Sequence, residues 1–382
     1  MRVCLIYDCL FPYTVGGAER RTRELAERLA LDGHTVTYLT LRQWEAGNEP
    51  DLGEVEVVAA GPRMALYVQG RRRIFPPLVF GGGVLWHLLR RGRSYDAVHT
   101  VSFPYFSLLA AALLRRRSGY RLVVDWFEVW TREYWEEYLG RIGGWLGWQV
   151  QRRCTRVRQR AFCFSRLHAR RLREEGYRGE VTVLEGAYSG SLERPRAQPA
   201  DPLIVFAGRH IPEKRVPALI PAVERLRDDI ADLRCEIYGD GPDRPEVERL
   251  VAEQGLEGVV AVMGFRDGHE VEQALHRALC LVLPSRREGY GLVVIEASSH
   301  ATPSVVVRDP DNAATELVSG GENGVIAASA SAEDLAAAVL EIHRAGLGMR
   351  EATAAWFERN AQRLSAERSL DAVAASYDSA RS

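Results

Sequence analysis

Lysine is almost absent from this 382-residue sequence, because Lys214 is its single lysine among 50 basic residues. The six cysteines form no C-x-x-C pair and no close cluster with histidine. This spacing argues against zinc sites and a disulfide framework, and it favours a reducing compartment. The nine histidines show no H-x-x-x-H or similar ligand spacing. We therefore expect no metal and no other cofactor.

Long apolar runs are missing as well. No run reaches the ~18 residues of a membrane span, and Met1–Tyr7 leads directly into an expected strand rather than a signal peptide. The chain also lacks a G-x-S-x-G motif, a catalytic cysteine signature and a full G-x-G-x-x-G. With 46% hydrophobic and 26% charged residues the composition is globular, and we expect a cytoplasmic protein.

Short apolar runs alternate with helical patterns in both halves of the chain, which predicts α/β architecture with parallel sheets covered on both faces. In the first half, strands are predicted at Arg2–Tyr7, His34–Leu41, Val55–Ala59, Ala97–Val101, Arg121–Asp125, Ala161–Phe164 and Val181–Leu184. Helices are predicted there at 18–31, about 83–92, 104–116, 145–160 and 166–175. In the second half, strands are predicted at Leu203–Ala207, Cys235–Tyr238, Val259–Met263, Leu279–Pro284 and Thr302–Val307, with helices at about 216–227, 332–342, 351–361 and 365–379.

At roughly 150 residues per domain, the length of the chain predicts about two domains. The proline-rich, weakly apolar stretch 191–202 is the best candidate for a linker. We therefore expect a first domain at 1–190, a second at 203–364, and a last helix within 365–382 that packs on the first domain.

A glycine-containing loop in the second half is the most informative stretch. It follows the predicted strand Leu279–Pro284 and opens a predicted helix, whose unpaired N–H groups favour an anion. Glu288 and Glu296 are eight residues apart and fall on nearly the same side by the ~3.6-residue period. Carboxylates accept hydrogen bonds from paired sugar hydroxyls, so these two glutamates could hold a ribose and a second sugar. The alternative is one solvated turn glutamate and one helix-face glutamate.

Four motifs follow one another along the chain. They are Gly16-Gly17-Ala18-Glu19, Gly208-Arg209 with Lys214, Tyr238-Gly239-Asp240-Gly241-Pro242, and Glu288-Gly289-Tyr290-Gly291-Leu292 followed by Glu296. In order and spacing they resemble the motifs of family 4 retaining glycosyltransferases with the GT-B fold. The resemblance covers nearly the whole chain and is most specific in the second half. It implies two Rossmann-like domains facing a cleft, with the nucleotide-sugar donor on the second and the acceptor mostly on the first.

The resemblance also implies a role for each motif. Arg209 and Lys214 would neutralise the leaving diphosphate and Glu288 would hold the transferred sugar, which makes these three the catalytic candidates. Glu296 would hold the ribose. The other donor-binding candidates are Gly16, Gly17, Gly239, Gly241, Pro242, Gly264, Phe265, Gly289, Tyr290, Gly291 and Leu292. In this family transfer retains the anomeric configuration by front-face attack, so the protein supplies positioning and charge.

One departure from the family pattern concerns the loop after Leu122–Asp125. The family often places a histidine there, near the donor sugar, but this chain has Phe127 at that position. His99 and Glu128 are the acceptor-side candidates that could substitute, and each has a structural or loop role as its alternative. Asp309-Pro310-Asp311 has the form of a metal-binding D-x-D, and we interpret it as a strand-end loop.

The function expected is therefore sugar transfer from a nucleotide-diphosphate sugar to a glycan, lipid-linked or natural-product acceptor. An epimerase of the same fold would need an acid/base array that the sequence does not show. The chain could instead be a catalytically silent sugar-nucleotide-binding protein. Its complete set of motif residues argues against this alternative: Arg209, Lys214, Glu288 and Glu296. The base, the sugar and the acceptor are not specified by these motifs.

Charge is distributed unevenly along the chain. Residues 1–200 carry a net +10 and residues 201–382 a net −11. From Arg141 to Arg178 there are eleven arginines and two acids, with Trp145, Trp148 and Phe162 nearby. This run could dock on an anionic membrane at the inner face, or it could be a solvated helix face. Nucleic acid is a poorer partner, because no nucleic-acid module accompanies the charge.

Overall fold

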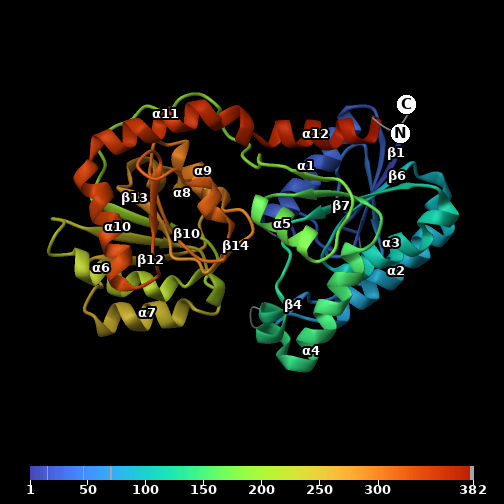
Figure 1. Cartoon of the computed structure of the whole chain (residues 1–382), viewed down its shortest axis with the longest axis horizontal. Coiled ribbons are helices and arrows are strands. Elements are labelled where there is room, and N and C mark those ends of the chain that lie inside the picture. The colour runs from blue at the N-terminus through green and yellow to red at the C-terminus, as the bar shows by residue number, and fades with distance from the viewer. Residues whose placement is uncertain (15, 46, 69–70, 379–382) are drawn as a thin grey trace. The chain divides into compact units, whose positions relative to one another are not determined.

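The computed structural model describes residues 1–14, 16–45, 47–68 and 71–378, and the chain divides into two compact units (Figure 1). Unit 1 consists of Met1–Leu184 with Ser369–Ser382, and unit 2 of Glu185–Arg368. The division therefore falls before the expected linker. Residues 191–202 belong to unit 2, where Leu192 and Ala200 pack against its core and the Asp201 N–H donates to the Arg277 carbonyl at 2.9 Å.

Unit 1 is built on a seven-stranded parallel sheet in the order β3-β2-β1-β6-β7-β8-β9. Its strands are β1 (Arg2–Ile6), β2 (Thr35–Thr40), β3 (Val55–Ala59), β6 (Ala97–Val101), β7 (Arg121–Trp126), β8 (Arg160–Cys163) and β9 (Val181–Val183). A two-stranded hairpin, β4 (Tyr67–Val68) and β5 (Arg71–Arg72), stands apart from this sheet.

The helices of unit 1 lie on both faces of its sheet. They are α1 (Gly17–Leu31), α2 (Phe75–Arg91), η1 (Gly92–Ser94), α3 (Tyr105–Ser118), α4 (Arg132–Thr155), α5 (Arg166–Glu174) and most of α12 (Ala366–Asp378). Figure 1 shows α2 and α3 on one side of the sheet and α1 with α12 on the other. No helix among the described residues is long and apolar enough to cross a membrane.

The last helix is fixed within unit 1 by contacts at long sequence separation. The Tyr377 hydroxyl lies 2.5 Å from His99 Nδ1, and the Arg121 guanidinium donates to the Tyr377 carbonyl. Arg28 on α1 pairs with Asp371 at 2.7 Å. Its residues from Ser369 onward are therefore part of the first unit, and the final residues 379–382 of the predicted helical segment lie outside the described residues.

Unit 2 repeats the plan with a six-stranded parallel sheet in the order β12-β11-β10-β13-β15-β17. Its strands are β10 (Leu203–Ala207), β11 (Arg234–Tyr238), β12 (Val260–Gly264), β13 (Cys280–Leu283), β15 (Ser304–Val307) and β17 (Gly324–Ala327), with the short pair β14 (Arg287–Glu288) and β16 (Asp311–Asn312) beside it.

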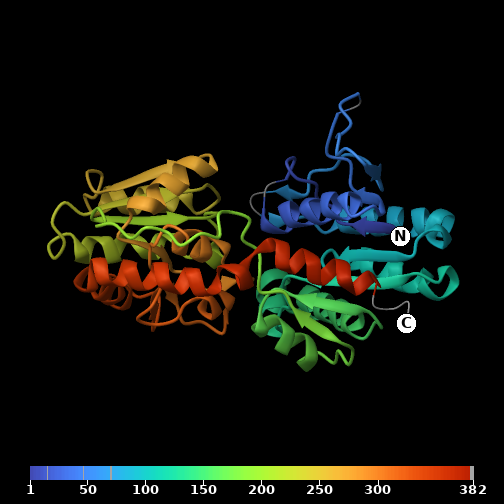
Figure 2. The same cartoon turned by 90° about the horizontal axis from the view of Figure 1, so that it is seen from above.

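The helical segments of unit 2 cover its sheet. Figure 2 shows the red α11 running along the unit. The segments are η2 (Pro212–Lys214), η3 (Val216–Ala218), α6 (Leu219–Leu226), α7 (Arg244–Glu253), α8 (Gly268–Arg277), α9 (Leu292–Ser298), η4 (Ala313–Leu317), α10 (Ala332–Ala345) and α11 (Leu347–Leu364).

Each sheet reverses its strand order once. The chain winds outward from β1 to β3 and then returns to place β6 on the other side of β1, and in unit 2 β13 lies on the other side of β10 from β11. Loops at the carboxyl ends of the two strands at such a point diverge and leave a crevice where α/β proteins bind ligands. The topology therefore predicts ligand-binding sites at the loops after β1 and β6, and at those after β10 and β13.

Candidate functional site

Two predicted catalytic residues meet at the crevice of unit 2. Lys214 ends the 3₁₀ turn η2 beyond β10, and Glu288 lies in β14 beyond β13. Lys214 Nζ lies 2.5 Å from Glu288 Oε1, and their side chains are 17% and 11% exposed. The Ser285 hydroxyl donates to the same carboxylate oxygen at 2.9 Å. The pair thus joins two loops that are about 75 residues apart in sequence but leave adjacent strands of the sheet.

A buried asparagine holds the Glu288 loop in place. Asn312, 2% exposed, donates its side-chain amide to the carbonyls of Ser285 and Val307 at 3.1 and 2.8 Å. The strand pair β14–β16 adds main-chain pairing between Glu288 and Asn312. The Arg286 N–H also donates to the Glu213 carbonyl at 2.9 Å, next to Lys214. These bonds fix the Glu288 carboxylate and the lysine turn relative to each other.

Two glycines bring the loop after β11 against the loop after β10. Gly239 has φ +117° and Gly241 φ +155°, values that L side chains rarely adopt. A Cβ at Gly239 would overlap the Gly208 carbonyl, and a Cβ at Gly241 would overlap that of His210. The His210 N–H donates to the Asp240 carbonyl at 2.9 Å, so the two loops are also hydrogen-bonded. Glycine is therefore required at both positions, because the backbones of the two loops lie too close together for a Cβ atom.

Gly239→Ala is expected to lower the free energy of unfolding by about 3 kcal/mol, because it combines positive-φ strain with the overlap at Gly208. Gly255→Ala is the matched control, since Gly255 also has positive φ (+63°) but open space where its Cβ would lie. The control should cost about 1 kcal/mol. Urea unfolding of both variants measures the difference, and equal costs would contradict the role assigned to close approach.

Arg209 and His210 differ in exposure although they are neighbours. The Arg209 side chain is exposed beyond β10. His210 is fully buried against the Phe206 ring, and among the described residues neither ring nitrogen has a hydrogen-bond partner. Burial lowers the pKa of His210, so the neutral ring is favoured. His210 was not predicted from the sequence, and its burial carries no sequence signal beyond its place beside the glycine motif.

The remaining donor-side candidates lie in other loops and helices of unit 2. Gly291, with φ +101°, is the N-cap of α9, and a Cβ there would meet the Ala314 Cβ at 2.6 Å. The Tyr290 hydroxyl donates to the Glu185 carbonyl. Glu296 lies in the second turn of α9. Burial is the main cause of the raised pKa of Tyr188, and the negative charge of Glu296 raises that pKa further. Phe265, after Gly264 at the end of β12, is 72% exposed.

In unit 1, Gly16 and Gly17 stand at the start of α1. Gly16 is the N-cap, in extended conformation, and a Cβ there would overlap the Glu19 carboxylate. Glu19 is buried and accepts a hydrogen bond from the Tyr7 hydroxyl at 3.0 Å. A Cβ at Gly17 would meet no atom within 4 Å. The donor-binding role that the resemblance implies for these two glycines stays a prediction.

The acceptor-side candidates are engaged inside unit 1. His99 is 3% exposed, with Nε2 3.0 Å from Asp125 Oδ1 and Nδ1 beside the Tyr377 hydroxyl. This geometry gives it a part in holding α12 rather than an open surface for a ligand. Glu128 accepts a hydrogen bond from Trp130 Nε1 at 2.8 Å. Phe127, at the family's histidine position, stacks on Phe164 with ring centroids 4.3 Å apart.

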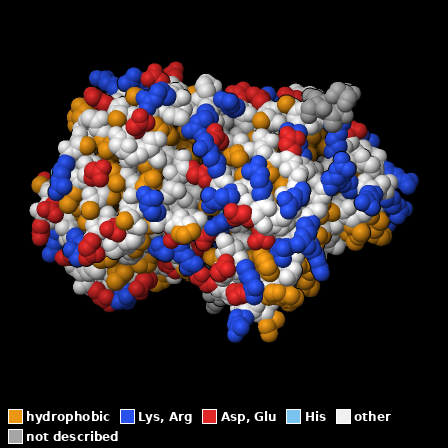
Figure 3. All heavy atoms as spheres, in the orientation of Figure 1, with side chains coloured by type: hydrophobic (Ala, Val, Ile, Leu, Met, Phe, Trp, Pro, Cys, Tyr) orange, Lys and Arg blue, Asp and Glu red, His pale blue; other side chains and the backbone are white. Residues whose placement is uncertain are grey.

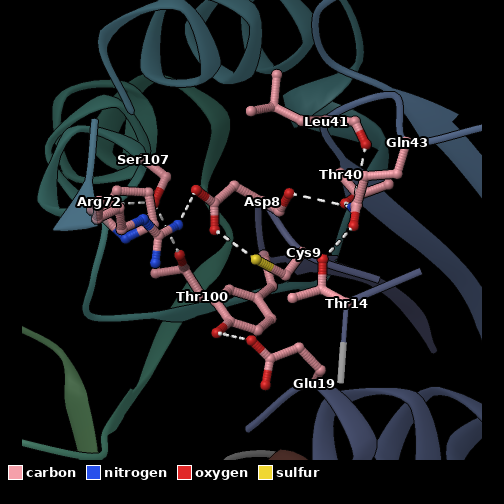
Figure 4. Close-up of polar contacts among 12 residues, drawn as sticks. Asp8, Cys9, Thr14, Glu19, Thr40, Leu41, Gln43, Arg72, Thr100 and Ser107 are labelled. Atoms are coloured by element: carbon pink, nitrogen blue, oxygen red, sulfur yellow. Dashed lines mark hydrogen bonds and ion pairs between the residues drawn. The ribbon is translucent and has the colours of Figure 1, made fainter. Parts of the chain in front are cut away.

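A polar cluster that the sequence did not indicate lies beyond β1. Figure 4 shows Asp8 between Arg72 on one side and Gln43 on the other. The Asp8 side chain is fully buried and pairs with the Arg72 guanidinium, which lies 4.8 Å from the centroid of the Phe103 ring. Gln43 donates to the Asp8 carbonyl at 3.3 Å and accepts from Thr14 at 2.6 Å. The cluster sits at the crevice of the first sheet, between the ends of β1 and β6.

The Asp309-Pro310-Asp311 motif forms part of the scaffold beyond β15. Asp309 pairs with Arg215 at 3.4 Å, and Asp311 pairs with Arg287 through the β14–β16 ladder. Among the described residues, no three His, Cys, Asp or Glu side chains gather as a metal site would require.

Two family models match the chain, one in each half. Residues 16–186 match the model described as "Glycosyl transferase 4-like domain", and residues 192–362 match "Glycosyl transferases group 1". Among curated relatives, alpha-D-kanosaminyltransferase of Streptomyces kanamyceticus is 30% identical over 138 residues, which are 36% of this chain and 35% of that protein. The match thus spans about a third of this relative's own length.

Solved structures resemble the whole chain. Sucrose-phosphate synthase from Thermosynechococcus elongatus has a TM-score of 0.81 at 20% identity and covers 99% of this chain and 98% of its own. Anabaena Alr3699/HepE, solved in complex with UDP and glucose, has a TM-score of 0.74 at 17% identity, with 99% and 100% covered. At these identities the likeness concerns the fold, which is that of the GT-B glycosyltransferases.

Proposed function

Because the chain belongs to the family 4-type glycosyltransferases with the GT-B fold, we propose that it transfers a sugar, with retention of configuration, from a nucleoside-diphosphate donor to an acceptor hydroxyl. The observation that carries the proposal is the Lys214–Glu288 pair at the crevice of unit 2. A cation beside a carboxylate suits a ligand that has an anionic diphosphate joined to a hydroxyl-rich sugar. We assign donor binding to unit 2 and acceptor binding to unit 1.

The proposed reaction needs charge stabilisation more than a protein nucleophile. The acceptor oxygen forms a bond to the anomeric carbon on the face from which the diphosphate departs, and the bond from that carbon to the phosphate oxygen breaks. The leaving phosphate takes the proton of the acceptor hydroxyl. Lys214 and Arg209 stabilise the negative charge that develops on the diphosphate, and Glu288 orients the sugar.

Glu296 is proposed to bind the ribose hydroxyls, because it follows Glu288 by eight residues and lies on the helix that the same loop opens. The Asp8–Arg72 cluster is proposed to contribute to the acceptor side of unit 1. A uridine nucleotide is the first donor to test, since a structural neighbour was solved with UDP and glucose. The acceptor class is proposed to be a glycan, a lipid-linked sugar or a natural product.

Thermal unfolding with a panel of UDP-, GDP-, ADP- and dTDP-sugars tests the proposal. We expect one nucleotide class to raise the midpoint, since a ligand at 100 times its Kd stabilises the folded state by about 2.7 kcal/mol. Incubation of that donor with candidate acceptors should then release nucleoside diphosphate and form a product with the donor's anomeric configuration.

Each other outcome contradicts the proposal in a distinct way. Conversion of the donor sugar to an epimer without acceptor would indicate an epimerase. A midpoint shift with no turnover across acceptors, unchanged in Lys214→Ala, would indicate a silent binding protein. An unshifted midpoint with every nucleotide would remove donor binding altogether.

A further inference from the structure

The outer face of α2 exposes large apolar side chains where a water-facing helix normally carries polar ones. Phe75, Leu78, Trp86 and Leu89 are 58%, 45%, 56% and 45% exposed. At ~100° per residue these four positions fall within an arc of about 80°. Its opposite face, which includes Phe80, Val84 and Leu88, is fully buried in unit 1. The helix is therefore apolar on both its buried and its open side.

Neighbouring helices extend this apolar surface. α2 packs closely along α3, where a Cβ at Gly81 would meet the Phe106 Cβ at 2.5 Å, and Leu113 on α3 is 71% exposed. At the other end, the Arg72 N–H donates to the Tyr138 hydroxyl at 3.2 Å, which brings the chain just before α2 against α4. Beyond the non-helical Gly140, α4 exposes three apolar side chains: Ile142 (80%), Trp145 (45%) and Leu146 (53%).

The segment that carries α2 and α3 is strongly basic. Residues 57–124, which include all of α2 and α3, contain eleven arginines and a single acidic residue, Asp96. The Arg90 guanidinium lies over the Trp86 ring at 3.9 Å from its centroid. Figure 3 shows blue arginines bordering the orange hydrophobic side chains over these helices and over α4. Apolar and cationic groups are thus interleaved.

A surface hollow of about 480 Å³ lies at the C-terminal end of α2. It is lined by four arginines, with Glu56 as its acidic member: Arg2, Arg90, Arg91 and Arg93. Glu56 pairs with Arg91 at 3.1 Å, so the remaining cations exceed the acid that faces them. Such a hollow suits an anionic headgroup, because several guanidinium groups converge on it.

The basic run Arg141–Arg178, one candidate for a membrane dock, contributes its first part, Ile142–Leu146, to this surface. Three of its arginines pair with acids: Arg152 with Glu175, Arg160 with Glu180 and Arg170 with Glu174. Two of its aromatic neighbours are also engaged, since Phe162 is fully buried and Trp148 Nε1 donates to Glu175 at 3.0 Å. Membrane contact by the run as a whole stays a prediction.

We propose that the outer face of α2, with Leu113 of α3 and Ile142–Leu146 of α4, docks on an anionic phospholipid bilayer. The apolar side chains enter the interface between headgroups and acyl chains, and the arginines contact the lipid phosphates. This inference rests on the proposed function. If unit 1 binds the acceptor, the docking surface would bring that unit to a lipid-linked acceptor. Lipid is the occupant that the absence of acids from α2 and α3 and the alternation of arginine with aromatic groups both favour.

Co-sedimentation of the full chain with vesicles tests this surface. We expect at least tenfold stronger partitioning onto phosphatidylcholine vesicles that contain about 30% phosphatidylserine than onto pure phosphatidylcholine, with most of it lost above about 0.3 M salt, where screening shortens to a few ångströms. Phe75→Ser with Trp86→Ser should reduce the partitioning at least tenfold. Leu31→Ser is the matched control, because Leu31 is 85% exposed on α1, outside this surface.

A second pair of variants separates the two basic regions. Arg90→Gln with Arg93→Gln should weaken the binding several-fold, whereas Arg153→Gln with Arg156→Gln, in the other run, should leave it unchanged. Equal partitioning onto neutral and anionic vesicles, or no partitioning at low salt, overturns the proposal. Light scattering that shows a dimer abolished by the Phe75 and Trp86 substitutions would assign the surface to a second copy instead. The donor-induced rise in thermal midpoint is measured alongside, so failure of docking and failure of the proposed function remain distinct.

Discussion

Lys214→Ala is expected to lower kcat for sugar transfer by about 10²- to 10³-fold, the effect of removing one preorganised charge from a developing anion. Lys214 Nζ is held at 2.5 Å from Glu288 in a site where both side chains are mostly buried. Water is therefore poorly placed to replace the ammonium group. Removing it also leaves the Glu288 carboxylate without its cation, so we expect a further loss of about 1–3 kcal/mol of stability.

Lys214→Arg separates the shape of this group from its charge. Lys214 is the single lysine among 50 basic residues, so this chain uses arginine wherever a cation is needed except here. A guanidinium is planar and longer, and it would have to displace Glu288 or Ser285 from the contacts they make. We expect about a tenfold or larger loss of kcat with the fold retained.

The neighbouring residue provides the matched control for that experiment. Arg215→Lys makes the reverse exchange one position along the same turn, where Arg215 pairs with Asp309 at 3.4 Å and is about one-third exposed. Its kcat/KM should stay within about threefold of the parent enzyme, as expected for a partly solvated pair. A Lys214→Arg enzyme with unchanged kcat/KM would show that the position needs only a positive charge.

Much of the fold follows from local patterns in the sequence. The predicted strands at Val55–Ala59, Ala97–Val101 and Leu203–Ala207 have the observed bounds. Leu203–Ala207 is the clearest case, because a buried strand of a parallel sheet is a short, continuous apolar run. The recognition of the GT-B fold is confirmed by the family models and by the structural neighbours. Both conclusions depend on signals confined to a few consecutive residues.

Helix starts were less predictable where glycine and proline intervene. α2 begins at Phe75, eight residues before the prediction, since Pro76 and Pro77 occupy its first turn, where a missing N–H costs nothing. Its glycines are tolerated because Gly81 packs against Phe106. α4 begins at Arg132, capped by the Thr131 side chain, and continues past a non-helical Gly140. In both helices tertiary packing overrides the helix propensity of the residues. Such packing cannot be predicted from the sequence of one segment alone.

The sequence motifs indicated candidate residues but not how those residues are arranged. Motif spacing named Lys214 and Glu288, yet their contact depends on β10 and β13 being neighbours, which is a property of the sheet. One of the two partners of His99, Tyr377, lies 278 residues away on the last helix. Asp8 carries no motif, and it becomes a candidate only because the strand order reverses at β1. Long-range pairing of this kind leaves no trace in local periodicity.

Glu288→Gln is expected to reduce kcat for transfer at least 10²-fold while changing the affinity for free nucleoside diphosphate by less than about threefold. The substitution preserves shape and the capacity to bond the Ser285 hydroxyl, but it removes the charge that holds Lys214. If Glu288 orients the transferred sugar, its loss affects the step in which that sugar moves. Single-turnover measurements with the donor identified by thermal shift provide the rate.

Glu296→Gln on α9 is the contrasting variant, because both substitutions convert a glutamate to its amide within eight residues. Assigned to the ribose, Glu296 should contribute to nucleotide binding, and its loss should weaken nucleoside-diphosphate affinity about tenfold, as removal of a hydrogen bond to a charged group does. Transfer at saturating donor should fall far less than in Glu288→Gln. Equal losses of nucleoside-diphosphate affinity in the two variants would contradict this division, since both carboxylates would then contact the same part of the donor.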